Sequence, residues 1–512
     1  MKQLKCPNLF TGVPVVALLL APLAALQAAD RVKPAKPNII VILSDDLGYG
    51  DAGCYGAKPE HVVTPNIDRL AKEGIRFTDG HSPASVCTPS RYSLLTGEYA
   101  FRNQKERGIL PGDASLGIKP GSFTMPEMFR ANDYATGFVG KWHLGLGDGR
   151  AIDWNGEIKP GPMEVGFSSA FFMPATGDRV PTVFIHDHRV ENLDPADPIA
   201  VSYLKKIGND PTGREDPEQA YVLLGVKGKG HDETITKGVS RIGFMTGGKV
   251  ARWTDERLMD RLTDEAIAFI KQNQTKPFFL YFATHGIHEP RVPAKRFVGK
   301  SGAGVYGDQI EELDDSVGRV LKTLDDLQLS TNTLVVFTSD NGGSPRNGSV
   351  GDMEAYCYGP RIHLNGHVPN GILRGGKYNV YEGGTRVPFI VRWTGHVPAG
   401  MTSPALISLT DLEASFARLI GVTLPDDAAP DSMDVLDALL GKSTSGRHEL
   451  VEHKQELACA LRMDNWKWID GQLYDLSNDL AEKRNLAMEQ PDRAKAMAAR
   501  LAELKASKRT RP

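Results

Sequence analysis

The sequence predicts an α/β protein with a large, mostly parallel sheet that is flanked by helices. Four continuous apolar runs support this class, because apolar runs too short for a buried helix are typical of strands covered on both faces. Amphipathic helical patterns lie between them, as the crossover connections of a parallel sheet require. The four runs are residues 38–43, 134–139, 277–282 and 333–338.

The first run, 38–43, is rich in β-branched residues and is the first predicted strand. A helix then begins at Thr64-Pro65 and ends at Gly74, because proline suits the first helical turn and glycine terminates helices. Two longer helices are predicted from apolar stripes, the first of them behind Thr254 as its N-cap. The stripes are Leu258, Leu262, Ala266, Phe269 and Ile270, and Ile310, Leu313, Val317, Val320, Leu321 and Leu324.

A leader segment begins the chain. Lys2 and Lys5 precede an apolar stretch (15–26) that leads into small residues, an order typical of a secretory signal peptide over residues 1–29. A proline interrupts the stretch, which is also shorter than the roughly 20 apolar residues of a membrane span. We therefore expect a cleaved leader, export to the periplasm or the medium, and no membrane contact after cleavage.

The remainder is predicted to have two parts. A catalytic domain covers residues 30–443, and a polar, linker-like stretch at 441–446 leads into a small C-terminal α+β subdomain over residues 444–512. The subdomain ends in a charged helix rich in Ala, Lys and Arg after Pro491.

Composition excludes some classes of function. The formal net charge of −3 provides no basic field for nucleic acid, so an anionic substrate has to be met by a local cationic pocket. Five cysteines are present. Cys6 leaves with the leader and Cys87 belongs to a motif described below, so Cys54, Cys357 and Cys459 can form at most one disulfide.

Polar residues follow the predicted strands. Asp45 and Asp46 follow the first strand, and Asp340 and Asn341 follow the strand at 333–338. In open α/β sheets ligands bind beyond the carboxyl ends of the strands. Three carboxylates and an amide oxygen suit Ca²⁺, with Mg²⁺ as the alternative, better than Zn²⁺. Taken singly, these residues are also common in turns.

Residues 85–97 read Ser-Val-Cys-Thr-Pro-Ser-Arg-Tyr-Ser-Leu-Leu-Thr-Gly. They fill every constrained position of the sulfatase signature, in which the Cys of Cys-x-Pro-x-Arg is oxidised to formylglycine. The chain resembles the type I sulfatases, formylglycine-dependent enzymes of the alkaline-phosphatase-like superfamily, from Asn38 to Leu476. It is most similar to glycan sulfatases of the N-acetylgalactosamine-6-sulfatase and arylsulfatase group.

The resemblance implies a role for each motif residue. Asp45, Asp46, Asp340 and Asn341 would hold the metal together with the modified Cys87; Arg91 and Lys141 would hold the formylglycine diol; His143 would act as base; and His288 with Lys377 would contact the sulfate and the leaving oxygen. One position departs from the family, because Asp133 stands where a glycine usually precedes the tyrosine of the second signature. Aspartate tolerates left-handed backbone, so we expect the turn to survive.

Physical chemistry supports the same roles. A sulfate ester repels nucleophiles unless its oxygens are neutralised, and the metal with Arg91, Lys141 and Lys377 would supply that charge. One hydroxyl of the diol would attack sulfur, and removal of a proton from the other would expel sulfate. Since imidazole titrates near neutral pH, His143 is the expected base and His288 the expected acid.

The sequence therefore predicts hydrolysis of sulfate monoesters, with an O-sulfated carbohydrate as the first-ranked substrate and a formylglycine-generating enzyme as the partner in maturation. Two long irregular stretches, 145–249 and 344–373, are rich in His and Arg and suit a hydroxylated or anionic ligand. Two alternatives stay open. One is a formylglycine-dependent phosphonate or phosphodiester hydrolase, and the other is a non-catalytic glycan-binding protein in which Cys87 is unmodified.

Overall fold

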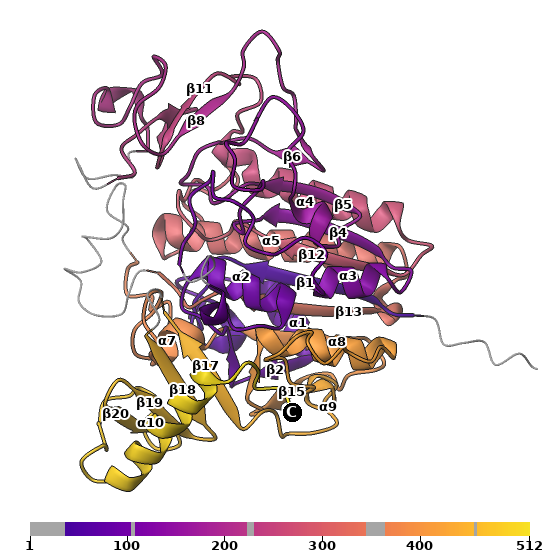
Figure 1. The fold of residues 1–512 in the computed structure, drawn as a ribbon, viewed down its shortest axis with the longest axis vertical. Coiled ribbons are helices and arrows are strands. Elements are labelled where there is room, and N and C mark those ends of the chain that lie inside the picture. The colour runs from indigo at the N-terminus through magenta and orange to yellow at the C-terminus, as the bar shows by residue number, and fades with distance from the viewer. Residues whose placement is uncertain (1–35, 104–107, 223–229, 345–363, 455–457) are drawn as a thin grey trace, which may run out of the picture. The chain divides into compact units, whose positions relative to one another are not determined.

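A ten-stranded sheet lies at the centre of residues 37–512 (Figure 1). The computed structural model describes residues 36–103, 108–222, 230–344, 364–454 and 458–512. The strand order is β15-β2-β14-β13-β1-β12-β4-β5-β6-β7. The strands are β1 (Asn38–Ser44), β2 (Ile75–Phe77), β4 (Ala135–Lys141), β5 (Ser169–Met173), β6 (Ile185–His186), β7 (Arg189–Val190), β12 (Phe278–Ala283), β13 (Thr333–Ser339), β14 (Phe389–Arg392) and β15 (Met401–Ser403).

The sheet is parallel at its centre and mixed towards its edges. Strands β13, β1, β12, β4 and β5 run parallel to one another, and four of them are the predicted strands. Antiparallel pairs occur outside this block, where β14 joins β13 and β2, and where β6 joins β5 and β7. The prediction of a mostly parallel α/β sheet is confirmed.

Alternation along β1 divides the core into two layers. Ile40 and Ile42 face one cluster of buried side chains, whereas Ile39, Val41 and Leu43 face the other. Helices cover both faces, as Figure 1 shows. The Ile40 face packs against α1 (Pro65–Glu73), α4 (Leu258–Gln272) and α5 (Gly304–Asp326), and the Ile39 face against α2 (Cys87–Thr96), α3 (Met125–Arg130) and α8 (Leu412–Ile420).

The predicted helix ends agree with the structure in most details. Helix α1 begins at Pro65 with Thr64 as N-cap and ends before Gly74. Thr254 precedes a 3-10 turn (255–257) that leads into α4, and its side chain makes no capping hydrogen bond. Asp133 has a φ of 63°, so aspartate does adopt the left-handed backbone expected for this turn.

A second, smaller sheet forms the C-terminal part and is drawn in yellow in Figure 1. Its four antiparallel strands are β17 (Glu449–His453), β18 (Cys459–Met463), β19 (Trp466–Ile469) and β20 (Gln472–Asp475). Helix α10 (Pro491–Ala506) packs on this sheet through Met497 and Leu501. The predicted α+β subdomain is thus present, and its exact boundary at residue 444 stays a prediction.

The remaining elements are short. They are α7 (Glu382–Thr385), α9 (Leu436–Leu439), and three strand pairs: β3 (Gly80–His81) with β16 (Ile407–Ser408), β8 (Ala200–Ser202) with β11 (Phe244–Thr246), and β9 (Ile235–Thr236) with β10 (Val239–Ser240).

Two sequence predictions fall outside the described residues: the leader at 1–29 and the state of Cys357. Among the described cysteines, Cys54 and Cys87 are free thiols. Within the described ranges, no helix combines the length and the apolar character needed to cross a membrane.

Candidate active site

The carboxyl ends of four neighbouring strands bring the predicted site residues together. Ser44, the last residue of β1, lies opposite Ser339, the last residue of β13. The residues that follow these two strands are Asp45 and Asp46 on one side, and Asp340 and Asn341 on the other. Lys141 ends β4, and His288 follows β12 in the same block. Parallel pairing therefore explains how residues 295 positions apart meet, as in the hydrogen bond from Asn341 to Asp46 (2.8 Å).

Each of the three carboxylates is paired with a basic side chain in the protein interior. The pairs are Asp45 with Lys141 (2.6 Å), Asp46 with Lys377 (2.9 Å) and Asp340 with Arg91 (2.7 Å). None of these six side chains is more than 3% exposed. Three negative and three positive groups balance, so a bound divalent cation leaves the site with a net positive charge that attracts an anionic ester.

The oxygen atoms of this cluster fit a divalent cation. Asp45 Oδ1 and Asn341 Oδ1 are buried without a hydrogen-bond partner among the described residues. Ligand atoms of Asp45, Cys87 and Asp340 lie within 4.8 Å of one another, as do those of Asp45, Asp46 and His288. Buried oxygens without a partner are costly, and hard cations prefer oxygen ligands, so the donor set suits Ca²⁺ or Mg²⁺.

The pKa values of Asp45 and Asp46 are shifted in opposite directions. Burial raises the pKa of Asp45 to about 7, against the opposing effect of Lys141. Burial also acts to raise the pKa of Asp46, but Lys377 and His288 outweigh it and hold that pKa below its usual range. Asp46 is therefore a fixed anion, whereas Asp45 gains most from a cation that replaces its proton.

Cys87 is the first residue of α2 and is 1% exposed. Val86 before it is extended, and Pro89 lies in the first helical turn, where its missing N–H costs no hydrogen bond. Anions are favoured at helix N-termini by the free N–H groups and the helix dipole. The motif thus places residue 87 where an anionic group is stabilised.

His143 is set up to accept a proton. Its Nε2 donates to the Leu110 carbonyl (2.9 Å), because a carbonyl can only accept, and Nδ1 therefore carries the free lone pair. No described residue bonds to Nδ1. Burial, followed by Lys141, holds the pKa of His143 well below its usual value. Thr88 links it to the helix of Cys87 by donating to the His143 carbonyl (3.0 Å).

His288 has the opposite ring nitrogen free. Its Nδ1 donates to the Glu289 carbonyl (2.7 Å), and its Nε2 lies 3.9 Å from Asp46 Oδ2. Burial, Lys377 and Lys141 hold the pKa of His288 well below its usual value. Both histidines are thus neutral in the substrate-free site, and the premise that they titrate near neutral pH does not hold there. An acid role for His288 requires the negative charge of the bound ester to raise its pKa.

Three residues at the site hold left-handed backbone without being glycine: Asp46 (φ 64°), His143 (φ 55°) and Tyr378 (φ 72°). Such conformations cost of order 1–3 kcal/mol each and persist where the surroundings enforce them. The strain therefore falls on residues that carry or adjoin the chemistry.

A cavity of about 120 Å³ opens beside Cys87. Its lining consists of Asp46, Cys87, Ile109, Asp178, Arg179, His231, His288, Glu289, Ser344, Lys377 and Tyr378. A larger hollow of about 740 Å³, between α8 and the chain end at Arg511 and Pro512, is lined by apolar and polar side chains alike. We identify the smaller cavity as the reactive one because several charged groups converge on it, although its volume is smaller.

Four charged or titratable cavity residues were missed from the sequence: Asp178, Arg179, His231 and Glu289. Asp178 and Arg179 follow β5, and they form an ion pair (2.9 Å) that His231 joins through Asp178 Oδ2 (3.0 Å). The apolar run at 169–173 was the available signal, but it lies in a stretch taken as irregular. The second irregular stretch was predicted over residues 344–373. Its His367 forms a hydrogen bond with Asp51 (2.7 Å), and its residues 345–363 lie outside the described ranges.

Hydrolysis of an anionic ester with help from a divalent cation is the reaction class that this fold and this site define. A profile of the sulfatase family matches residues 37–422. The chain belongs to the sulfatase family.

Individual relatives agree with this assignment. Over 94% of its length the chain is 45% identical to an N-acetylgalactosamine-6-O-sulfatase of Bacteroides thetaiotaomicron, 95% of which is covered. It is 35% identical to the steryl-sulfatase of Mus musculus, over 89% of this chain and 74% of the relative. A solved structure from a study of glycosaminoglycan metabolism by Bacteroides thetaiotaomicron has a TM-score of 0.86 and 45% identity, covering 92% of this chain and 100% of that one.

The protein is therefore a sulfuric ester hydrolase with an alkaline-phosphatase-like fold. Membership of the family implies a metal ion and a formylglycine.

Proposed function

We propose that the protein hydrolyses O-sulfate esters on a carbohydrate, with formylglycine made from Cys87 and a bound Ca²⁺. The observation that carries the proposal is the position of Cys87, at a helix N-terminus and on the wall of a cavity that also holds Lys377 and His288. A carbohydrate is favoured by the polar wall formed by Asp178 and Arg179, and by the N-acetylgalactosamine-6-O-sulfatase relative.

Formylglycine supplies a hydrated aldehyde as the nucleophile, and the cation supplies charge that polarises the sulfate group. Lys377, on the cavity wall, binds the sulfate oxygens. Arg91 and Lys141 fix the orientation of Asp340 and Asp45 and hold the formylglycine diol. His143 Nδ1 takes the proton whose removal releases sulfate, and His288 Nε2 faces the leaving oxygen.

The substrate proposal is tested with defined sulfated oligosaccharides that differ only in the position of one sulfate. We expect release of sulfate from one position, measured by ion chromatography and by the mass of the desulfated product. Matched phosphate esters separate a sulfatase from a phosphonate or phosphodiester hydrolase. Turnover of nitrophenyl sulfate with none of the glycans would refute the carbohydrate assignment.

The two histidines have separable roles. If His288 protonates the leaving oxygen, His288→Ala slows sugar sulfates, which have poor leaving groups, by about 10²–10⁴-fold and nitrophenyl sulfate far less. If His143 acts in sulfate release, His143→Ala releases one equivalent of nitrophenol per formylglycine and then stops. Rapid-quench kinetics on both substrates measure the two effects.

His186→Ala is the matched control, because His186 is an exposed histidine on β6 that lies near Asp187 (3.9 Å) and the ring of Phe171 and does not line the cavity beside Cys87. It is expected to behave as the wild type. Equal losses on both substrates for His288→Ala, or full steady-state turnover for His143→Ala, would reverse the assignments.

The chain is also proposed to be exported and matured. The leader pattern at 1–29 supports cleavage and export, and the motif at 85–97 supports oxidation by a formylglycine-generating enzyme. Protein recovered from the periplasm or medium should begin near residue 30, as measured by intact mass. A full-length N-terminus on the active protein would contradict the first part.

A further inference from the structure

The small C-terminal sheet presents charged residues on the face opposite α10. Arg462 on β18 and Lys467 on β19 are direct cross-strand partners, so they share one face of the sheet. Two like charges in this relation repel, and both side chains are at most 1% exposed. Their burial requires compensation from elsewhere in the fold.

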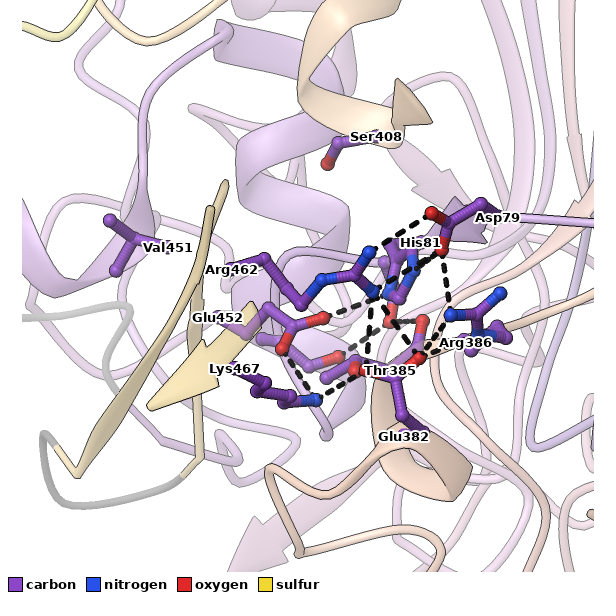
Figure 2. A network of polar contacts seen from close by, with 12 residues as sticks. Asp79, His81, Glu382, Thr385, Arg386, Ser408, Val451, Glu452, Arg462 and Lys467 are labelled. Atoms are coloured by element: carbon purple, nitrogen blue, oxygen red, sulfur yellow. Dashed lines mark hydrogen bonds and ion pairs between the residues drawn. The ribbon is translucent and has the colours of Figure 1, made fainter. Parts of the chain in front are cut away.

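The compensation comes from a buried charge network that Figure 2 shows. Lys467 Nζ lies 2.8 Å from both Glu382 and Glu452. Arg462 contacts Asp79 (3.0 Å) and Glu382 (3.4 Å). The charge network is Asp79, His81, Glu382, Arg386, Glu452, Arg462 and Lys467, all labelled in Figure 2, together with Glu482, which lies 3.9 Å from Lys467 Nζ.

His81 and Arg386 complete its interior. The two ring nitrogens of His81 lie 2.8 Å from Asp79 and from Glu452, and these carboxylates raise the pKa of His81 although burial acts to lower it. Arg386 contacts Asp79 (2.8 Å) and Glu382 (2.6 Å). Every cation in the network thus lies within 4.0 Å of at least two carboxylates.

Two of the carboxylates, Asp79 and Glu382, belong to the two segments that supply the catalytic groups, whereas Glu452 and Glu482 lie in the C-terminal part. Asp79 begins the segment 79–86, which leads directly to Cys87. Glu382 opens α7 in the loop 374–386, which contains Lys377. The C-terminal cations therefore hold both segments at once.

Backbone hydrogen bonds join the same three parts. Ser85 N–H donates to the His453 carbonyl of β17 (2.9 Å), and His453 N–H donates to Pro83 (3.0 Å). Tyr378 N–H, next to Lys377, donates to the Ser85 carbonyl (2.9 Å). The end of β17, the Cys87 segment and the Lys377 loop thus form one continuous set of contacts.

Glu482 binds both ends of the loop 374–386. Its Oε2 accepts from the Glu382 N–H (2.7 Å), and its carbonyl accepts from Arg374 (2.8 Å). The loop in turn touches the metal-binding turn, because Gly342 N–H donates to Gly384 (2.9 Å). A Cβ at Gly342 would lie 1.8 Å from the Gly383 carbonyl, so the two loops are in close contact.

From these contacts we infer that Glu482 and the charge network are positioning elements, through which the C-terminal sheet fixes Cys87 and Lys377 relative to each other; the inference rests on sulfate ester hydrolysis at residue 87. None of the network residues lines the reactive cavity. They act through the two loops rather than on the substrate.

The test compares Glu482→Met with Glu482→Gln. Methionine keeps the length of the side chain but removes the acceptor for Glu382 N–H, whereas glutamine keeps it. We expect Glu482→Met to lower kcat per formylglycine by about 10²-fold, the cost of a misplacement of roughly 1 Å, and Glu482→Gln to restore it. Formylglycine content is measured by peptide mass, kcat with nitrophenyl sulfate, and Tm by calorimetry.

Two further variants keep the test decisive. Met497→Ala destabilises the C-terminal sheet from its α10 face without touching the network, and it should lower Tm but leave kcat per formylglycine unchanged. Arg374→Ala removes the second contact to Glu482 at an exposed position, so the protein should fold, and kcat per formylglycine should fall.

The inference is overturned if Glu482→Met keeps wild-type kcat per formylglycine, if Met497→Ala loses as much at equal Tm, or if lower formylglycine content explains the whole loss. A wild-type protein that cleaves no sulfate ester contradicts the proposed function instead. The two failures are therefore distinguishable.

Discussion

Cys87→Ala is expected to abolish activity, with a loss in kcat of about 10⁶-fold, the scale seen when a hydrolase loses its nucleophile. Alanine cannot be oxidised to an aldehyde, and no other described side chain on the cavity wall replaces a hydrated aldehyde. The measurement is kcat with nitrophenyl sulfate, together with the mass of the tryptic peptide 77–91. In the wild type this peptide should have lost the thiol and gained an aldehyde that reacts with hydrazides.

The other described cysteines are the matched controls. Burial raises the pKa of Cys459 to about 11, and burial with Asp68 raises that of Cys54, so both thiols are protonated and unreactive. Cys54→Ala and Cys459→Ala should keep the wild-type kcat. Full activity in a preparation that carries only unmodified Cys87 would contradict the formylglycine mechanism.

Asp340→Ala is expected to remove both the bound cation and the activity, and to destabilise the fold. Asp340 accepts two hydrogen bonds from Arg91 (2.7 and 3.0 Å), and Arg91 is fully buried. Removing one partner of a buried ion pair costs about 3–5 kcal/mol, and Arg91 would keep only the more distant Asp45 (3.7 Å) as a counter-charge. Relief of repulsion among the carboxylates does not offset this, since each of them already has a cation.

Asp431→Ala provides the control for stability. Asp431 is also fully buried and pairs with an arginine, Arg102 (2.8 Å), away from the reactive cavity. Its loss should lower Tm by a similar amount while cation binding, measured by calorimetric titration with Ca²⁺, and kcat persist. An Asp340→Ala protein that still binds Ca²⁺ with wild-type affinity would exclude this carboxylate from the metal site.

The central strands and their ends could be predicted because their signals are local. A buried parallel strand such as β1 is continuously apolar, and the residues that follow it fall at one edge of the sheet whatever the connections. The motif at Cys87 is equally local. The turn at Asp133 could also be predicted locally, because aspartate tolerates the left-handed backbone that this turn adopts.

Other features depend on long-range packing. β5 is only five residues long, so Asp178 and Arg179 gave no clear sign of lying at a strand end. The low pKa of His143 arises from burial beside Lys141, which sequence does not reveal. The pairing of Glu382 with Lys467 joins residues 85 positions apart, and no local pattern specifies it.

The contact between Asp79 and Arg462 spans 383 positions. At a synthesis rate of about 5–20 residues per second, Asp79 emerges roughly 20–80 s before its partner. During this interval the segment that leads to Cys87 lacks its contact with β18, because that strand has not yet been synthesised. Because Cys87 is 1% exposed once the chain has folded, residue 87 is most accessible to chemistry while the last part of the protein is still being made.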